Sequence, residues 1–373
     1  MIYFDNAAST PVFDSVSEHM YLLQKEVFGN PSALHAFGRK ARVEVERARA
    51  LIAKKMNVQP AEIFFTSGGT EANNAILWGC AKDLNRKVFI TSPTEHPCVL
   101  NTLESICKSL PVEVQFVDID NMGQIDMSHL EFLLKNNKNA VVSLMHANNE
   151  TGVLLPMNEV APLCKENGAL FHSDIVQTAG KYNLDFQSLG FDFAAVSAHK
   201  FHGPKGVGFM YVRSGSFFKP FITGGMQERK MRAGTENVVG ISGMGKALYF
   251  ALENMNDTIA YVSSIKERLL NLLKTEIPGA FVNGSPMEKS LYSLVNISLP
   301  KTYNSEMLLA KLDIEGIAVS TGSACNSGSG KGSHVLTAIG ADPERPSVRV
   351  SFSRFNTIEE VDRFAEVLKG IGV

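Results

Sequence analysis

The chain has 373 residues, of which 45% are hydrophobic and 20% are charged, and its formal net charge at pH 7 is −2. There is no basic excess, which argues against nucleic-acid binding, and no apolar run reaches the roughly 18–20 residues that a transmembrane helix needs. A chain of this length is too long to fold around one small hydrophobic core, so we expect a large domain and a smaller one.

The N-terminus and the cysteines bear on the compartment. The first residues, Met1 to Asp5, lack the basic and long apolar segments of a signal peptide, so we expect a cytoplasmic protein. Five cysteines without a Cys-x-x-Cys pair argue against a disulfide framework and against a metal site. Four of them lie in apolar or helical stretches and are predicted to be buried hydrophobic side chains: Cys80, Cys98, Cys107 and Cys164.

The first part of the chain predicts a polar turn followed by two helices. Residues 5–11 form the turn, in which Asn6 either stabilises the loop, the favoured interpretation, or reaches a ligand. A helix is expected over about 14–28, and a basic amphipathic helix over about 33–56. We interpret its basic residues as a solvated face: Arg39, Arg42, Arg47 and Arg49.

A glycine pair marks the start of an α/β pattern. A short strand at 62–66 leads through Ser67, Gly68, Gly69 and Thr70 into a helix over 71–82. Exposed backbone N–H groups at a helix start favour a bound anion such as phosphate. A plain turn with Thr70 as the N-cap explains the same residues equally well.

Strands and helices then alternate along the chain, which predicts a mostly parallel sheet covered by helices on both faces. Ligands bind beyond the carboxyl ends of such strands, and polar clusters follow there, at 95–96, 146–150 and 172–177. No Gly-x-Gly-x-x-Gly fingerprint opens the first unit, so no dinucleotide is expected. The predicted strands are 87–91, 112–117, 140–145, 169–172, 193–197 and 207–212, with helices at 97–109, 127–137 and 157–167.

Lys200 lies on a turn between two of these strands, within residues 197–206. It is either an ordinary surface charge or an amine that forms a Schiff base, which requires a desolvated site. Ser197 and His199 lie beside it, and both are side chains that can donate a hydrogen bond to a phosphate. The rest of the chain must decide between these two interpretations.

The C-terminal part predicts a smaller α+β domain after the polar loop 224–237 and a helix at 239–254. Helices are expected at 257–276, 304–314, 333–339 and 357–370, and strands at 293–299, 316–320 and 346–352. Cys325 lies in a segment of glycines and serines, 321–333, that we expect to be mobile. An exposed thiol there is a candidate nucleophile.

Taken together, the motifs resemble the pyridoxal-phosphate-dependent cysteine desulfurases of the NifS/IscS type, within the class-V aminotransferases. The match runs through nearly the whole chain and in order. The matching motifs are Asp5-Asn6-Ala-Ala8, Gly29-Asn-Pro-Ser-Ala-Leu-His35, Phe65-Thr-Ser-Gly-Gly-Thr-Glu-Ala-Asn-Asn74, Glu95-His96, Asn148-Asn-Glu-x-Gly152, His172-Ser-Asp-Ile-Val-Gln177, Ser197-Ala-His-Lys200, Gly203-Pro-Lys-Gly206, Arg232-Ala-Gly-Thr-Glu-Asn237 and Ser320-Thr-Gly-Ser-Ala-Cys325.

The resemblance implies the fold and the roles around the cofactor ring. The fold would be type I of the pyridoxal-phosphate enzymes, with a mostly parallel sheet of the seven-stranded type. A large domain would comprise residues 15–254 and contain this sheet, and a small domain would comprise residues 1–14 plus 255–373. Lys200 would bind the cofactor as a Schiff base, and Asp174 would keep the pyridine nitrogen protonated. Gln177 would hydrogen-bond the ring hydroxyl, and His96 would stack on the ring and transfer protons.

The resemblance also implies roles at the phosphate and the substrate. Thr70, Ser197 and His199 would bind the phosphate from one subunit, and Thr235 from the partner, which makes the protein a homodimer. Asn149 would lie near the ring and substrate, Arg349 would clamp the substrate carboxylate, and Asn6 is a second candidate for substrate binding. No metal is implied.

The implied reaction converts L-cysteine to L-alanine and leaves a persulfide on Cys325, for transfer to an iron–sulfur scaffold or a tRNA-thiolating enzyme. An aminotransferase or a selenocysteine lyase on the same fold is the alternative, although an aminotransferase has no need for Cys325. A non-enzymatic scaffold is a third possibility, and the set Lys200, Asp174, His96 and Cys325 argues against it.

Overall fold

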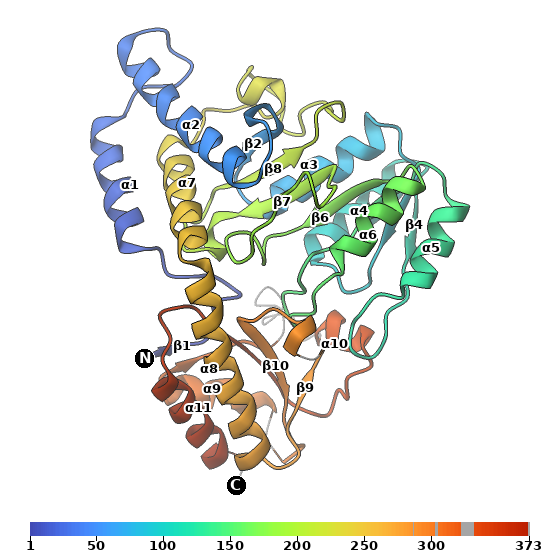
Figure 1. Ribbon diagram of the computed structural model, residues 1–373, viewed down its shortest axis with the longest axis vertical. Coiled ribbons are helices and arrows are strands. Elements are labelled where there is room, and N and C mark those ends of the chain that lie inside the picture. The colour runs from blue at the N-terminus through green and yellow to red at the C-terminus, as the bar shows by residue number, and fades with distance from the viewer. Residues whose placement is uncertain (286, 303–304, 322–331, 372–373) are drawn as a thin grey trace.

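A seven-stranded sheet with the order β2-β8-β7-β6-β5-β3-β4 forms the centre of the larger part of the molecule (Figure 1). The computed structural model describes residues 1–285, 287–302, 305–321 and 332–371. Neighbouring strands are parallel except β8, which runs antiparallel to both β2 and β7. The strands are β2 (Ile63–Thr66), β3 (Val88–Thr91), β4 (Glu113–Phe116), β5 (Val141–Ser143), β6 (Leu170–Asp174), β7 (Phe193–Ser197) and β8 (Gly208–Val212).

Helices cover both faces of this sheet, which explains why the central strands β7 and β8 are buried along their whole length. Along β7, Phe193 and Ala195 pack with α3 and α4 on one face, and Ala194 and Val196 pack with the helices of the other face. The helices are α1 (Asp14–Glu26), α2 (Ala36–Lys55), α3 (Gly69–Lys82), α4 (Pro97–Ser109), α5 (Met127–Asn136), α6 (Met157–Glu166) and α7 (Val238–Glu253).

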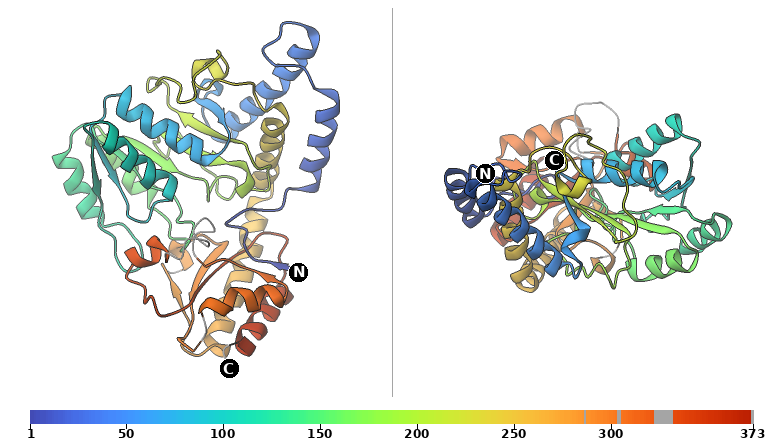
Figure 2. Two further views of the ribbon diagram at one scale, coloured as in Figure 1. Left: turned by 180° about the vertical axis from the view of Figure 1, so that it is seen from behind. Right: turned by 90° about the horizontal axis from the view of Figure 1, so that it is seen from above.

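The C-terminal part has a core of its own beneath an antiparallel sheet of order β12-β10-β9. The N-terminal strand β1 joins this part by pairing in parallel with β11, so the N-terminus lies beside the C-terminal helices (Figure 2). The elements are β1 (Ile2–Tyr3), α8 (Met255–Glu276), β9 (Phe281–Asn283), β10 (Leu294–Ser298), α9 (Ser305–Ile314), β11 (Ile317–Ala318), α10 (His334–Ala338), β12 (Ser347–Ser351) and α11 (Ile358–Ile371).

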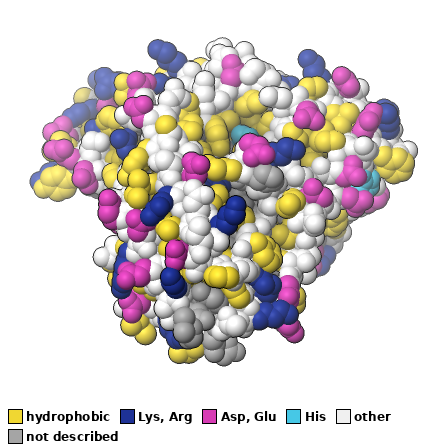
Figure 3. Space-filling view, turned by 60° about the horizontal axis from the view of Figure 1, so that its bottom comes forward, with side chains coloured by type: hydrophobic (Ala, Val, Ile, Leu, Met, Phe, Trp, Pro, Cys, Tyr) yellow, Lys and Arg dark blue, Asp and Glu magenta, His cyan; other side chains and the backbone are white. Residues whose placement is uncertain are grey.

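This architecture confirms the predicted fold class, a mostly parallel sheet covered on both faces with a smaller α+β unit. The sequence did not predict β1 or β9. Both are very short, and both exist through pairing with strands distant in sequence. None of the helices in the described ranges has the length and apolar character of a membrane span. In Figure 3, acidic and basic side chains are interspersed over the face in view.

The prediction of a solvated basic face on α2 is wrong for Arg49, which is 1% exposed. Its guanidinium donates to both carboxylate oxygens of Glu228, over 2.7 and 2.8 Å, and to the carbonyl of Ile63. Glu228 also accepts from the backbone N–H of Phe65. The loop that contains Glu228 folds back against α2, a long-range contact that helical periodicity cannot reveal.

Candidate active site

A cleft of about 460 Å³ opens where the carboxyl ends of β2, β6 and β7 meet. The N-terminal turn and β12 close it from the side of the smaller part. Most of the predicted site residues line this cleft: Thr70, His96, Asn149, Asp174, Gln177, Ser197, His199, Lys200 and Arg349.

One end of the cleft has the form of an anion site. Helix α3 begins there at Gly69, and no side chain caps its N-terminus. A Cβ on Gly69 would lie 2.7 Å from Cγ2 of Val176, so glycine leaves room for this valine side chain at the start of α3. Uncapped N–H groups and the helix dipole favour a negatively charged group, and the hydroxyl side chains of Thr70 and Ser197 line the same end.

Lys200 reaches the cleft from the short helix η2 (Ala198–Lys200) that follows β7. Its Nζ donates to the backbone carbonyls of Ala7 and Ala8, over 2.6 and 2.9 Å, so the N-terminal turn orients the amine. Beside it, burial lowers the pKa of His199 to about 4, with Lys200 and Lys205 acting in the same direction. The imidazole of His199 is therefore neutral near pH 7.

Asp174 ends β6 with its carboxylate in the cleft, and it is 8% exposed. One oxygen accepts from the backbone N–H of Val176 over 2.9 Å, and the other from Nδ2 of Asn73 over 2.7 Å. Two neutral donors therefore fix the plane of the carboxylate without neutralising its charge.

His96 is the N-cap of α4, and its Nδ1 accepts from the backbone N–H of Cys98 over 3.1 Å. Burial lowers the pKa of His96, while the charge of Asp174 opposes the shift. The neutral ring must carry its proton on Nε2, because Nδ1 acts as an acceptor. The capping interaction thus selects the tautomer of a histidine that lines the cleft.

Arg349, in β12, is 2% exposed and lines the opposite side of the cleft. Its Nη1 donates to the carbonyl of Asn149 over 2.9 Å, and its Nη2 to a carboxylate oxygen of Asp5 over 2.8 Å. Nε of Arg349 and Oδ1 of Asn149 are buried and have no partner among the described residues. The guanidinium therefore keeps one donor, and the amide one acceptor, that no described residue uses.

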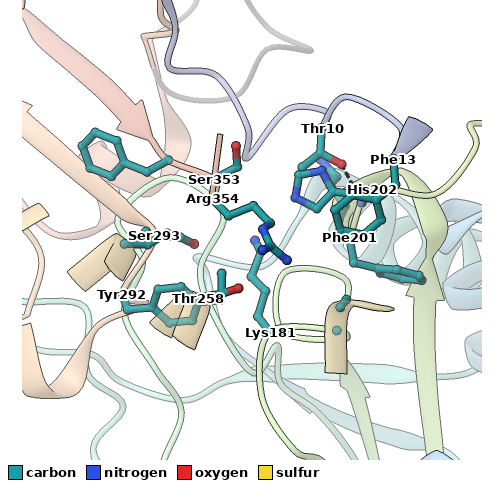
Figure 4. Close-up of a pocket in the computed structure, with 15 residues that line it drawn as sticks. Thr10, Phe13, Lys181, Phe201, His202, Thr258, Tyr292, Ser293, Ser353 and Arg354 are labelled. Atoms are coloured by element: carbon teal, nitrogen blue, oxygen red, sulfur yellow. Dashed lines mark hydrogen bonds between the residues drawn. The ribbon is translucent and has the colours of Figure 1, made fainter. Parts of the chain in front are cut away.

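Gln177 lines the cleft and contacts Lys181, which lines a second, smaller cavity of about 40 Å³ together with Lys200. Nε2 of Gln177 donates to the carbonyl of Ala7 over 2.9 Å, and Oε1 accepts from Nζ of Lys181 over 3.4 Å. Figure 4 shows Lys181 in the smaller cavity together with Arg354. Burial, reinforced by nearby positive charges, lowers the pKa of Lys181 to about 7.

Two predicted site residues in the described part of the chain, Asn6 and Thr235, do not line the cleft. Asn6 is 2% exposed, and its Nδ2 donates to the carbonyl of Ser351 and to Oδ1 of Asn356, the loop-stabilising arrangement that the sequence favoured. Thr235 is exposed. Cys325 lies outside the described residues.

The prediction that four cysteines are buried is wrong for two of them. Cys80 and Cys164 are buried, but Cys107 is exposed and Cys98 is half-buried in the wall of the cleft. Cys107 lies on the solvent side of α4, and Cys98 in its first turn. The apolar character of the surrounding sequence did not reveal which side of the helix each thiol occupies.

No role was predicted for Asn73, His172 or Asp5, although each makes a hydrogen bond at or behind the cleft. Asn73 and His172 are both 0% exposed, and they are polar residues in an apolar helix and an apolar strand. That contrast was the available signal, because a buried polar side chain needs a partner. For Asp5 no local signal exists, since its partner Arg349 lies 344 residues away.

Comparison with known proteins assigns the family. Residues 2–364 match the model of the aminotransferase class-V family. A cysteine desulfurase IscS from Dictyoglomus turgidum is 41% identical over 374 residues, covering 99% of this chain and 94% of the relative.

Two solved structures extend the comparison. A NifS-like protein superposes with a TM-score of 0.92 at 37% identity and covers 99% of this chain and 98% of its own. SspA in complex with cysteine superposes with a TM-score of 0.82 at 30% identity, covering 96% of this chain and 100% of its own. The chain therefore belongs to the class-V aminotransferase family and, within it, to the cysteine desulfurases of the NifS/IscS type.

Proposed function

We propose that the protein is a pyridoxal-phosphate-dependent cysteine desulfurase that takes sulfur from L-cysteine, releases L-alanine and holds the sulfur as a persulfide on Cys325. The observation that carries this proposal is the convergence of Lys200, Asp174 and Arg349 on one cleft. These residues supply an amine, a carboxylate and a carboxylate-binding cation from three distant parts of the chain.

The residues of the cleft fit the cofactor. The uncapped start of α3, with Thr70, Ser197 and His199, would hold the phosphate, and Thr235 of a second subunit would complete this site. Asp174 would hold the pyridine nitrogen, Gln177 the ring hydroxyl and His96 the face of the ring. When bound, the cofactor supplies a carbonyl for covalent attachment and an electron sink for the substrate Cα.

Arg349 would bind the substrate carboxylate, for which guanidinium geometry is well suited. The unpartnered Nε of Arg349 supports this assignment, because a buried donor normally has an acceptor as its partner. The complex of the similar protein SspA with cysteine supports the choice of substrate. Asn6 makes its contacts within the protein, so its part in substrate binding would be to stabilise the N-terminal turn.

Lys200 would carry out the proton transfers, and Cys325 would take up the sulfur. Nζ of Lys200 would accept the α-proton of the substrate and return a proton to the product. The Cys325 thiolate would attack the substrate sulfur, so that an S–S bond forms as the C–S bond breaks. The electron pair of the C–S bond stays with the carbon, which takes up a proton and becomes the methyl group of alanine.

Two features of the proposal concern assembly. The active unit would be a homodimer in which each subunit supplies Thr235 to the other, and residues 1–14 plus 255–373 would form the domain that carries Cys325. The persulfide would pass to an acceptor protein, either an iron–sulfur scaffold or a tRNA-thiolating enzyme.

Incubation of the purified, cofactor-loaded protein with L-cysteine tests the activity. Alanine should appear together with a persulfide on the peptide that contains Cys325. An aminotransferase would instead require a 2-oxo acid as the amino-group acceptor and would leave Cys325 unmodified, which would overturn the proposal.

A further inference from the structure

A chain of buried polar side chains runs away from the cleft behind Asp174. Oδ2 of Asp174 accepts from Nδ2 of Asn73 over 2.7 Å, and Oδ1 of Asn73 lies 3.0 Å from Nε2 of His172. Nδ1 of His172 lies 2.9 Å from Oγ of Ser143. Asn73, His172 and Ser143 are all 0% exposed. Three elements, α3, β6 and β5, therefore contribute to one connected path that ends in the active site.

The charge of Asp174 determines the direction of every hydrogen bond in this chain. An ionised carboxylate only accepts, so Asn73 must present its NH₂ group to Asp174 and its oxygen to His172. His172 must then donate from Nε2 and accept at Nδ1, and Ser143 must donate its hydroxyl proton. A neutral imidazole meets these requirements, because it has one donor and one acceptor. Burial favours this form, since it lowers the pKa of His172 to about 3.

We propose that Asn73 and His172 are positioning residues that hold the Asp174 carboxylate ionised and directed into the cleft, so that it keeps the cofactor nitrogen protonated. His172 acts on Asn73 by fixing which end of the amide faces the carboxylate. Asn73 acts on Asp174 by donating a hydrogen bond to Oδ2, which fixes the orientation of the carboxylate. The role toward the cofactor depends on the proposed function, whereas the hydrogen-bond directions do not.

A purely structural role predicts a different pattern of side chains. All three side chains are enclosed by apolar residues of the sheet and of α3, where aliphatic residues of similar size would pack without the cost of desolvation. The second N–H of Asn73 also has a partner, Sγ of Cys98 at 3.2 Å. The amide is thus held at both ends, and a flip would place its oxygen against the oxygen of a carboxylate.

The first test uses the cofactor-free protein with ¹⁵N-labelled histidine. The imidazole of His172 should give the resonances of a neutral ring with the proton on Nε2, unchanged from about pH 5 to about pH 8. A ring protonated on Nδ1, or one that titrates in this range, would overturn the hydrogen-bond chain. This measurement does not depend on cofactor binding, so a protein that binds no cofactor would contradict the proposed function while leaving this result interpretable.

The second test uses [¹⁵N-pyridine]pyridoxal phosphate bound to the wild type and to three variants. Asn73→Leu and His172→Leu should bind the cofactor but shift the pyridine resonance toward the unprotonated form, and should lower kcat by roughly 10- to 100-fold, as loss of a supporting hydrogen bond does at other sites. His172→Gln should retain the wild-type resonance, because its amide can donate to the same oxygen of Asn73. A wild-type resonance in both leucine variants would overturn the proposal. If Asn73→Leu does not fold, the comparison of His172→Leu with His172→Gln decides the matter alone.

Discussion

Arg349 in β12 and Asp5 near the N-terminus form an ion pair over 2.8 Å, across a sequence separation of 344 residues. The side chain of Arg349 is 2% exposed, and that of Asp5 is 17% exposed. This pair fixes one end of the guanidinium while Nε stays without a partner among the described residues. The N-terminal segment therefore orients the guanidinium that, in the proposed function, would receive the substrate carboxylate.

Replacing Arg349 should weaken substrate binding without affecting the cofactor. A hydrogen bond to a charged group contributes about 1.5–3 kcal/mol, so kcat/KM for L-cysteine should fall by roughly 10- to 100-fold in Arg349→Met, mainly through KM. The absorbance of the bound cofactor should not change. Arg345→Met is the matched control, because Arg345 contacts Ser298 and the carbonyl of Gly279, away from the cleft. Equal losses in both variants would contradict the assignment.

Lys200→Ala should remove both the yellow absorbance of the covalently bound cofactor and all turnover. The reason is that no other lysine combines a position in the cleft with contacts to the N-terminal turn, as far as the described residues show. The exposed Lys219 is a suitable control, and Lys219→Ala should retain absorbance and rate. Cysteine turnover in Lys200→Ala would show that another amine binds the cofactor and transfers the proton.

The buried pair Arg49–Glu228 should matter for stability. Removal of one partner leaves a buried charge without compensation, which costs about 3–5 kcal/mol, so Arg49→Met should lower the unfolding temperature markedly. The exposed pair Lys108–Glu104 offers a control, since its side chains are 72% and 63% exposed. Glu104→Gln should leave the unfolding temperature nearly unchanged, because an exposed ion pair contributes little to stability.

The double variant Arg49→Met, Glu228→Leu completes this experiment. It should recover part of the loss, because no unpaired charge remains buried. Thermal unfolding followed by circular dichroism measures all three variants. If Arg49→Met is no less stable than Glu104→Gln, the pair does not hold the loop of Glu228 against α2.

Local sequence patterns predicted those features of the fold that depend on residues close together in the chain. The apolar runs of β7 and β8 and the polar residues that follow β6 placed Asp174, Gln177 and Lys200 at one edge of the sheet before the fold was known. Contacts between distant segments could not be predicted in this way. Arg49 has the spacing of a surface residue on α2 and is buried only because Glu228, 179 residues later, folds against it.

The same limit applies to the site. Sequence motifs identified Asp174, but not that Asn73 and His172 support it, because their mutual distance depends on how α3 packs on β6. They identified Arg349, but not its partner Asp5. Asn6 matched a motif, yet its side chain is used within the N-terminal turn, so a motif match did not specify which of its residues faces the cleft.

Complementation between subunits tests the shared site. A Lys200→Ala subunit lacks the amine, and a Thr235→Ala subunit would lack the threonine that its partner needs, so heterodimers of the two should have one complete site. Activity should therefore rise when the inactive Lys200→Ala variant and the weakened Thr235→Ala variant are mixed, unfolded and refolded together. A monomer by light scattering, or no gain on mixing, would count against a threonine supplied by the partner.

The fate of the sulfur atom tests the central claim most directly. Wild-type protein and Cys325→Ser should be incubated with L-cysteine, followed by trapping of persulfides and peptide mapping by mass spectrometry. The wild type should release alanine and carry the additional sulfur on Cys325 alone, not on the exposed Cys107. Cys325→Ser should still bind cofactor and substrate, because Lys200, Asp174 and Arg349 are intact, but should form no persulfide. Release of alanine and sulfide by Cys325→Ser at the wild-type rate would contradict the account and would instead indicate a lyase that needs no thiol.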